Sequence, residues 1–423
     1  MYLGDVKCQK ILIRTPRLGK SKSRVLKLSP QTCPMLNALE TTKARWLCLV
    51  RPPQKAAIFN ESPNLDGNQQ FLPVTAAASM PNWAGITQLV AKLMEDDGFD
   101  GAAACYVARS HFLKSIAEHQ ERDVILYASN WVWSSSNPQG DVSILPEDVV
   151  GLMAVVSGLK NSKLDLILHT PGGDPNTAEA ILKYLRQKFK HIRVVIPFAA
   201  MSAGTLIACG ANEIVMGRHS FIGPTDPQLM VRHPFGTSMV AAQAIIQDFN
   251  MAQRASAGQE HLGGWGPLLE QYPKGLISQC LDAMGLSKQL ARDWLVRYMF
   301  SQTNEVAGPP APSGEDGGST EPKPPEVESV TDVDAQKKAD AISEWLSDHS
   351  EHKAHGRFIS RSEAMEHGLK IVALEDDNVF QDLVLSVFHT VMLQFAQKPD
   401  CSKIIENSEG NFFFSPNSRG FNN

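Results

Sequence analysis

Two consecutive strand, turn and helix units between Lys163 and Gln228 constrain the fold more than any other part of the chain. The first unit has a short apolar run, Leu164 to His169, followed by a Pro-Gly-Gly turn and a helical pattern. The second unit repeats this order, with the apolar run Ile192 to Phe198, a turn of small residues and a helix from Leu206 to Ala211. Strands that alternate with helices over short connections form parallel sheets covered on both faces, so we expect an α/β domain.

The helix after the first turn carries its own start and stop signals. Asp174 is a capping residue, Pro175 suits the first helical position, and apolar residues recur at helical spacing up to Leu185. Lys188 and Lys190 then favour the C-terminal end, because positive charge there complements the helix dipole. We therefore expect this helix to begin directly after the glycine turn.

The turn of small residues in the second unit contains Ser202, at the start of the second helix. Unpaired backbone N–H groups at a helix start stabilise negative charge, and small neighbours such as Gly204 let a substrate backbone approach closely. Gly172 and Gly173 can aim further N–H groups into the same space, since glycine reaches conformations that other residues avoid. The pattern predicts a nucleophilic serine beside an oxyanion hole, although each motif alone is also typical of an ordinary cap or turn.

Three stretches of sequence carry a resemblance to a known family. The residues HTPGG and FAAMSAGTLIACGANEIVMGRHSFIGPTDPQ resemble the serine dehydrogenase proteinase family, part of the wider group of Clp proteolytic subunits, signal peptide peptidase A and crotonase-like folds. The stretch GRFISRSEAMEHGL, from Gly356 to Leu369, is similar to the RFxSxxEAxxxGL segment of Clp subunits. The spacing from Gly173 to Ser202 is also similar to that of the Clp proteolytic subunit. The resemblance implies a Clp/crotonase-like parallel sheet with flanking helices.

The same resemblance implies an activity and an assembly. It implies a serine peptidase in which Ser202 attacks a peptide carbonyl, while the N–H groups of Gly173 and Ala203 hold the oxyanion. A peptide or an unfolded protein is the implied substrate, and neither a cofactor nor a metal is implied. It further implies a closed homo-oligomer, and the apolar character of the predicted surface helix from Ala241 to Met251 agrees with subunit contacts.

The general base is where this sequence departs from the Clp pattern. The stretch around Asp226 stands where Clp subunits have a histidine, and Gly356 stands at the place of the Clp aspartate, with His355 beside it. We predict an exchange, with His355 as the base and Asp226 as its orienting carboxylate, because such triads are defined by geometry and not by chain order. Lys274 and His219 are alternative bases, and a plain loop histidine with a turn-capping aspartate is the alternative to the exchange.

Three histidines follow one another closely at His349, His352 and His355. This spacing is compatible with a metal site, but no clustered carboxylate or cysteine completes a ligand set in the sequence. We therefore predict no metal.

Composition excludes several classes of protein. With 43% hydrophobic residues and a net charge of −5 over 423 residues, the chain is typical of a soluble globular protein and not of a basic nucleic-acid-binding protein. Its seven cysteines show no CxxC or metal-ligand spacing, which indicates a reducing compartment. No uninterrupted apolar run approaches the roughly 18 residues needed to span a bilayer, and no signal core is present. We expect no membrane span and a cytoplasmic location.

The sequence predicts one core domain over residues 85–405. A mostly disordered extension, residues 1–84, precedes it, and a tail, residues 406–423, follows it. Within the domain, the stretch 303–334 is rich in Pro, Gly, Ser and Glu, which is typical of a flexible insertion. The Clp-like pattern resumes after this stretch, so it does not separate two domains.

Two other classes of function stay open beside the peptidase. A crotonase-like thioester enzyme would use the same oxyanion hole without a nucleophile, and it would bind coenzyme A and need a catalytic acid. A non-catalytic Clp-fold assembly module would keep the fold but lack an aligned base near Ser202. Labelling with a fluorophosphonate probe, with and without Ser202→Ala, discriminates these classes from a serine peptidase.

Overall fold

The computed structural model describes residues 82–133, 142–233, 236–257, 265–266, 270, 272–301 and 333–416. All of them belong to one compact unit, which spans Leu47–Asn423. The predicted N-terminal extension up to residue 81 and most of the predicted insertion, residues 302–332, lie outside the described residues.

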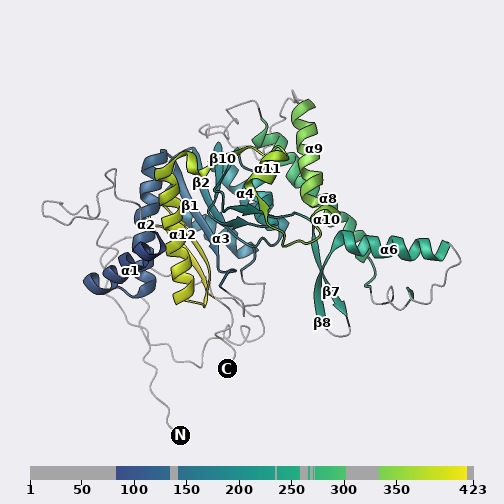
Figure 1. The fold of residues 1–423 in the computed structure, drawn as a ribbon, viewed down its shortest axis with the longest axis horizontal. Helices are drawn as coiled ribbons and strands as arrows, with labels where there is room; N and C mark the ends of the chain where they lie inside the picture. Colours follow the sequence, from purple (N-terminus) through teal and green to yellow (C-terminus); the bar gives the residue numbers. More distant parts are fainter. Residues whose placement is uncertain are drawn as a thin grey trace, which may run out of the picture. The chain divides into compact units, whose positions relative to one another are not determined.

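A seven-stranded sheet in the order β10-β5-β3-β2-β1-β11-β12 forms the centre of the domain (Figure 1). Its strands are β1 (Asp123–Ser129), β2 (Lys163–His169), β3 (His191–Ile196), β5 (Glu213–Met216), β10 (Ile371–Ala373), β11 (Cys401–Asn407) and β12 (Phe412–Pro416). The strands from β10 to β1 are parallel, and β11 and β12 are antiparallel additions. The predicted α/β class, with a sheet that is mostly parallel, is confirmed.

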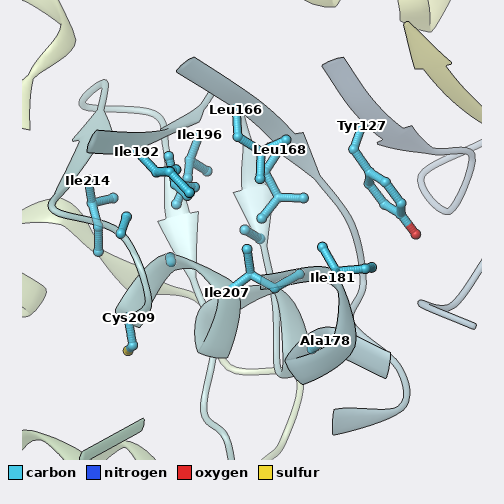
Figure 2. Packing of buried hydrophobic residues seen from close by; sticks show 14 of the residues in the cluster. Tyr127, Leu166, Leu168, Ala178, Ile181, Ile192, Ile196, Ile207, Cys209 and Ile214 are labelled. Atoms are coloured by element: carbon cyan, nitrogen blue, oxygen red, sulfur yellow. The ribbon is translucent and has the colours of Figure 1, made fainter. Parts of the chain in front are cut away.

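Helices cover both faces of this sheet, because side chains of a strand alternate between its faces. On β2, Leu166 and Leu168 pack with α3 (Pro146–Val156), α4 (Pro175–Lys188) and α5 (Ala203–Cys209), as the cluster in Figure 2 shows in part. Ile167, between them, packs toward α1 (Trp83–Asp97), α2 (Gly101–Gln120) and α12 (Asn378–Gln397) on the other face. The helices α2 and α12 lie side by side there (Figure 1).

Helix α12 is the one described helix that is long and apolar enough to cross a membrane by length and composition. Of its apolar window, 61% is buried inside the domain. Burial of this extent is typical of the core helix of a soluble protein, so the helix is weak evidence for a membrane span.

The remaining described elements lie outside the main sheet. A small sheet joins β4 (Ala199–Ala200), β6 (Phe221–Ile222) and β9 (Ile359–Ser360), and a hairpin joins β7 (Gln228–His233) to β8 (Gly236–Ala241). The helices are α6 (Ala242–Ala257), α8 (Leu276–Trp294) with a π turn (Leu295–Met299), α9 (Val333–Ser347), α10 (His349–His352), α11 (Arg361–Glu366) and a 3-10 turn (Leu374–Asp376). Ala199–Ala200 is thus a short strand, where we predicted part of a turn.

The predicted tail 406–423 is wrong at its start, because β11 and β12 continue the sheet to Pro416. Strand β11 lies against β1, so β1 is an interior strand and not an edge strand. Two buried ion pairs explain why the sequence concealed β11: Glu406 pairs with Arg109, and Lys403 pairs with Asp148. Charged residues are rarely buried unless they are paired. A segment that carries two of them is therefore predicted from its sequence to be exposed chain and not a core strand.

Replacing Glu406 with Ala should destabilise the domain by about 3–5 kcal/mol, because it leaves the fully buried Arg109 guanidinium without its partner. The exposed Glu409, in the turn after β11, is the matched control, and its replacement by Ala should change stability by less than about 0.5 kcal/mol. Urea unfolding followed by circular dichroism measures both. Equal midpoints for the two variants would contradict the assignment of β11 to the core.

Candidate active site

The backbone of Ser202 is strained. The residue follows β4 at the N-cap of α5, with φ of 51° and ψ of −116°. A positive φ is uncommon for a residue with a side chain, costs about 1–3 kcal/mol, and persists only where the surrounding structure imposes it. The serine side chain is partly exposed, although its neighbours Met201 and Ala203 are buried. Among the described residues, none is hydrogen-bonded to Ser202 Oγ, and the hydroxyl does not cap α5.

Backbone pairing on both sides imposes this conformation. Thr170, at the end of β2, donates from its N–H to Ala199 O at 3.0 Å and accepts at its carbonyl from Met201 N–H at 3.0 Å. On the helical side, Leu206 N–H donates to Ser202 O at 3.1 Å. The side-chain hydroxyl of Thr205 donates to Ala200 O at 2.9 Å, which links the first turn of α5 to β4.

The predicted glycine turn backs directly onto this serine turn. Gly172 has φ of 96°, and a Cβ atom built on it would lie 2.7 Å from Ser202 Cβ and 3.0 Å from Ala203 N. Gly173 has φ of 155°, and a Cβ atom there would collide with the backbone of Ile144. Only glycine satisfies both the conformation and the close approach at these positions.

Two backbone N–H groups beside Ser202 are unused. Ile144 N–H donates to Gly172 O at 2.7 Å, and Asp174 N–H donates to Ile144 O at 3.0 Å, which leaves the N–H of Gly173 between them. The N–H of Ala203 opens the first turn of α5. Within the described part of the chain, neither group has an acceptor. Paired free donors next to a hydroxyl are the arrangement that stabilises a developing oxyanion.

Gly204 and Gly172, which we expected to contact substrate, have packing roles through their own contacts. The N–H of Gly204 donates to Met201 O at 2.8 Å, and a Cβ atom there would lie 2.6 Å from Thr170 Cγ2. The N–H of Gly172 lies 3.2 Å from Thr170 Oγ1. Their lack of a side chain brings α5 and the glycine turn close to the end of β2.

A buried ion pair lies behind the Gly173 turn, and sequence reasoning missed it. Asp148, at the start of α3, accepts from Leu145 N–H at 2.8 Å, from Tyr127 OH at 2.9 Å and from Lys403 Nζ at 2.8 Å. Burial raises the pKa of Asp148, while the Lys403 ammonium opposes that rise. Since Leu145 follows Ile144, this network fixes the segment that pairs with the Gly173 turn.

Asp226 and His355 are brought together. The Asp226 side chain is 2% exposed, and its Oδ1 lies 2.6 Å from His355 Nδ1. A second imidazole, that of His349, lies with Nδ1 2.9 Å from Oδ2 of the same carboxylate. Gln228 Nε2 also donates to Oδ2, at 2.9 Å. The sequence showed the cluster of histidines but not that two of them share one aspartate.

The segment that carries Asp226 is tied to the serine turn. Gly223 N–H donates to Thr205 Oγ1 at 3.0 Å, and Thr205 is three residues after Ser202. A Cβ atom on Gly223 would lie 3.3 Å from Met201 Cα, so the two backbones are in close contact. The structure therefore joins Asp226 to His355 and this segment to the serine turn, but it has no bond from His355 to Ser202 Oγ.

The third histidine of the cluster lies in the core. His352 Nε2 donates to Trp345 O at 2.7 Å, its Nδ1 accepts from Arg357 at 3.0 Å, and burial lowers its pKa. In the described part of the chain, no group of three or more His, Cys, Asp or Glu side chains is arranged to hold a metal ion.

The other candidate bases lie elsewhere. His219 is exposed in the turn before β6, and Lys274 is exposed just before α8. His169, in the HTPGG motif, is fully buried, and burial lowers its pKa to about 3. Its ring packs against Phe388 with centroids 5.1 Å apart, so it is a neutral core histidine and a poor base.

Comparison with known proteins gives a family match over part of the chain. Residues 146–248 match the family described as ClpP-like SDH-type serine proteinase. Two uncharacterized proteins of Methanocaldococcus jannaschii are similar to this chain. One is 45% identical over 78 residues, which cover 18% of this chain and 27% of the relative. The other is 46% identical over 66 residues, which cover 16% of this chain and 23% of the relative. The match thus spans about a quarter of the length of these relatives.

A solved structure is also similar over a limited stretch. It is a mutant of the 1510-N membrane-bound stomatin-specific protease, 24% identical, with a TM-score of 0.20. The match covers 28% of this chain and 59% of that one. Ser202, both turn glycines and Asp226 lie inside the family match, whereas His349 and His355 lie beyond it.

Replacing Gly173 with Ala should destabilise the protein by about 1–3 kcal/mol, because the new Cβ collides with the Ile144 backbone in a conformation that alanine avoids. Gly285, inside α8 with open space around its Cα, is the control. Its replacement by Ala should stabilise the protein by about 0.5–1 kcal/mol, since alanine favours helix. Thermal unfolding compares the two, and a Gly173→Ala midpoint at or above that of the unmodified chain would contradict the packing described here.

Proposed function

We propose that this chain, whose residues 146–248 match the ClpP-like SDH-type serine proteinases, is a serine peptidase that hydrolyses peptide bonds through an acyl-enzyme on Ser202. The observation that carries the proposal is the geometry of that serine. Its backbone is strained, and within the described residues neither its hydroxyl nor the N–H groups of Gly173 and Ala203 have a hydrogen-bond partner. The family match supports peptidase chemistry in general, and this geometry supports Ser202 as the residue that performs it.

The proposed reaction follows from the positions of the groups. Ser202 Oγ attacks the peptide carbonyl, and the N–H groups of Gly173 and Ala203 hold the oxygen as it becomes negative. His355 takes the serine proton at Nε2 and passes it to the leaving amine. Asp226 accepts from Nδ1–H of His355, which keeps Nε2 as the basic nitrogen and stabilises the imidazolium. Water, activated by the same imidazole, then hydrolyses the ester and restores the hydroxyl.

The contacts of Ser202 and Asp226 weigh against the two other classes of function. A thioester enzyme of the crotonase type needs the N–H groups but gains nothing from a strained serine with a free hydroxyl. An assembly module without catalysis needs neither that serine nor a buried carboxylate bonded to two imidazoles. Strain and buried charge both cost stability, and they persist where activity requires them.

Several expectations from the sequence stay predictions. They are a peptide or unfolded protein as substrate, a closed homo-oligomer, the absence of a nucleic-acid partner and a cytoplasmic location. For the oligomer, the exposed apolar side chains of Met230, Met239 and Met251 on the hairpin and on α6 are supporting observations.

Replacing Ser202 with Ala should abolish labelling by a fluorophosphonate probe and peptide hydrolysis, because no nucleophile remains. The fold should persist with nearly unchanged thermal stability. Ser202→Gly should be equally inactive but more stable than Ser202→Ala by about 1 kcal/mol, since glycine adopts the positive φ without strain. Retained peptide cleavage in a clean preparation of either variant would remove Ser202 from the reaction.

Replacing His355 with Asn should lower the labelling rate constant by about 10²–10⁴-fold, because the carboxamide can donate to Asp226 but cannot take the serine proton. The exposed His219 provides the control, and His219→Asn should label at the unmodified rate. Mass spectrometry of the labelled protein over time gives the rate constants. Unchanged labelling of His355→Asn would exclude this residue as the base.

A further inference from the structure

We propose that His349 is a positioning residue of this site, whose imidazole holds the Asp226 carboxylate so that one oxygen stays directed at His355. The inference rests on the proposed function, since it assigns a role within the same group of residues. It starts from the geometry, which places a second imidazole on the carboxylate and not only the predicted one.

The burial of Asp226 makes each of its hydrogen bonds important. A carboxylate removed from water loses its hydration, and donors on both oxygens must replace it. Oδ1 has His355 Nδ1 at 2.6 Å, while Oδ2 has His349 Nδ1 at 2.9 Å and Gln228 Nε2 at 2.9 Å. Rotation of the carboxylate would move Oδ1 away from His355. The two donors on Oδ2 oppose this rotation.

Both imidazoles use the same nitrogen toward Asp226. An ionised carboxylate only accepts, so Nδ1 carries the proton in each ring and Nε2 of a neutral ring holds a lone pair. Only one of the two rings takes the proton of a single serine. The shorter bond, 2.6 Å, belongs to His355, which is the base in the proposed function. His349 then acts through the carboxylate.

The position of His349 is set from outside the site. Its backbone N–H donates to Gln243 Oε1 at 2.8 Å, and Gln243 Nε2 donates to Asp348 Oδ1 at 3.1 Å. Asp348 in turn caps α10 by accepting from Ser350 N–H at 2.8 Å. A side chain of α6 thus holds the first turn of α10, and with it the imidazole that bonds Asp226.

The test uses the rate constant of fluorophosphonate labelling of the full chain. His349→Phe keeps an aromatic ring but removes one of the two donors to Oδ2, and labelling should slow by about tenfold to hundredfold, the usual effect of one hydrogen bond to a charged group. His349→Asn restores a donor at similar reach and should recover to within about threefold of the unmodified rate. Recovery by Asn separates positioning from base catalysis, because His355→Asn keeps a donor as well and should not recover.

Two further variants complete the design. Gln243→Ala withdraws the support of α10 without touching the carboxylate, and it should slow labelling by a smaller factor than His349→Phe. If His349→Phe fails to fold, Gln243→Ala becomes the test of the positioning role. Labelling of Gln243→Ala at the rate of the unmodified chain would then contradict the proposal. His219→Asn is the unaffected control.

The outcomes separate this inference from the proposed function. An unmodified chain that is not labelled at Ser202 contradicts the proposed function itself. Labelling at the unmodified rate in His349→Phe overturns the positioning role while the peptidase proposal stands. Recovery by Asn at position 355 but not at position 349 would make His349 the base, which also overturns the inference.

Discussion

The strained backbone of Ser202 is the constraint on which the candidate site depends. It holds because Thr170 pairs with Ala199 and Met201 on one side and because α5 begins directly on the other. The glycine turn must then pass close behind the serine, which excludes any side chain at Gly172. Around this turn lie a hydroxyl and two N–H groups without a partner among the described residues, and the contact between Gly223 and Met201 brings the segment of Asp226 to the same turn.

Local patterns predicted the part of the site that consecutive residues build. The strand, turn and helix order around Gly173 and Ser202 depends on apolar spacing, on Asp174 as a cap and on Pro175, and all of these act within a few residues. The structure has this cap, with Asp174 accepting from the N–H groups of Asn176 and Thr177. The family match over residues 146–248 covers the same region, in which contacts between residues close in the sequence determine the local structure.

Long-range pairing accounts for what the sequence did not reveal. Lys403 and Glu406 can be buried in β11 only because Asp148 and Arg109, which are distant in the sequence, pair with them. Without knowledge of these partners, the two charges argue against a buried strand. The hairpin between Gln228 and Ala241 was also missed, because its exposed residues lack the alternation of a half-buried strand. The sequence predicted the contact of His355 with Asp226 but not that of His349, because the spacing of the three histidines did not show that His352 would instead contact Trp345 O in the core.

The antiparallel strand β11 also sets an order of events during synthesis. The turn of Gly173 is supported through Asp148, whose ammonium partner, Lys403, comes 255 residues later in the chain. His349 and His355 are likewise made long after Ser202. A nascent chain that already contains the serine and its glycine turn thus has neither the ion pair behind that turn nor an imidazole on Asp226. Assembly of the proposed site therefore has to wait until nearly the whole domain has left the ribosome.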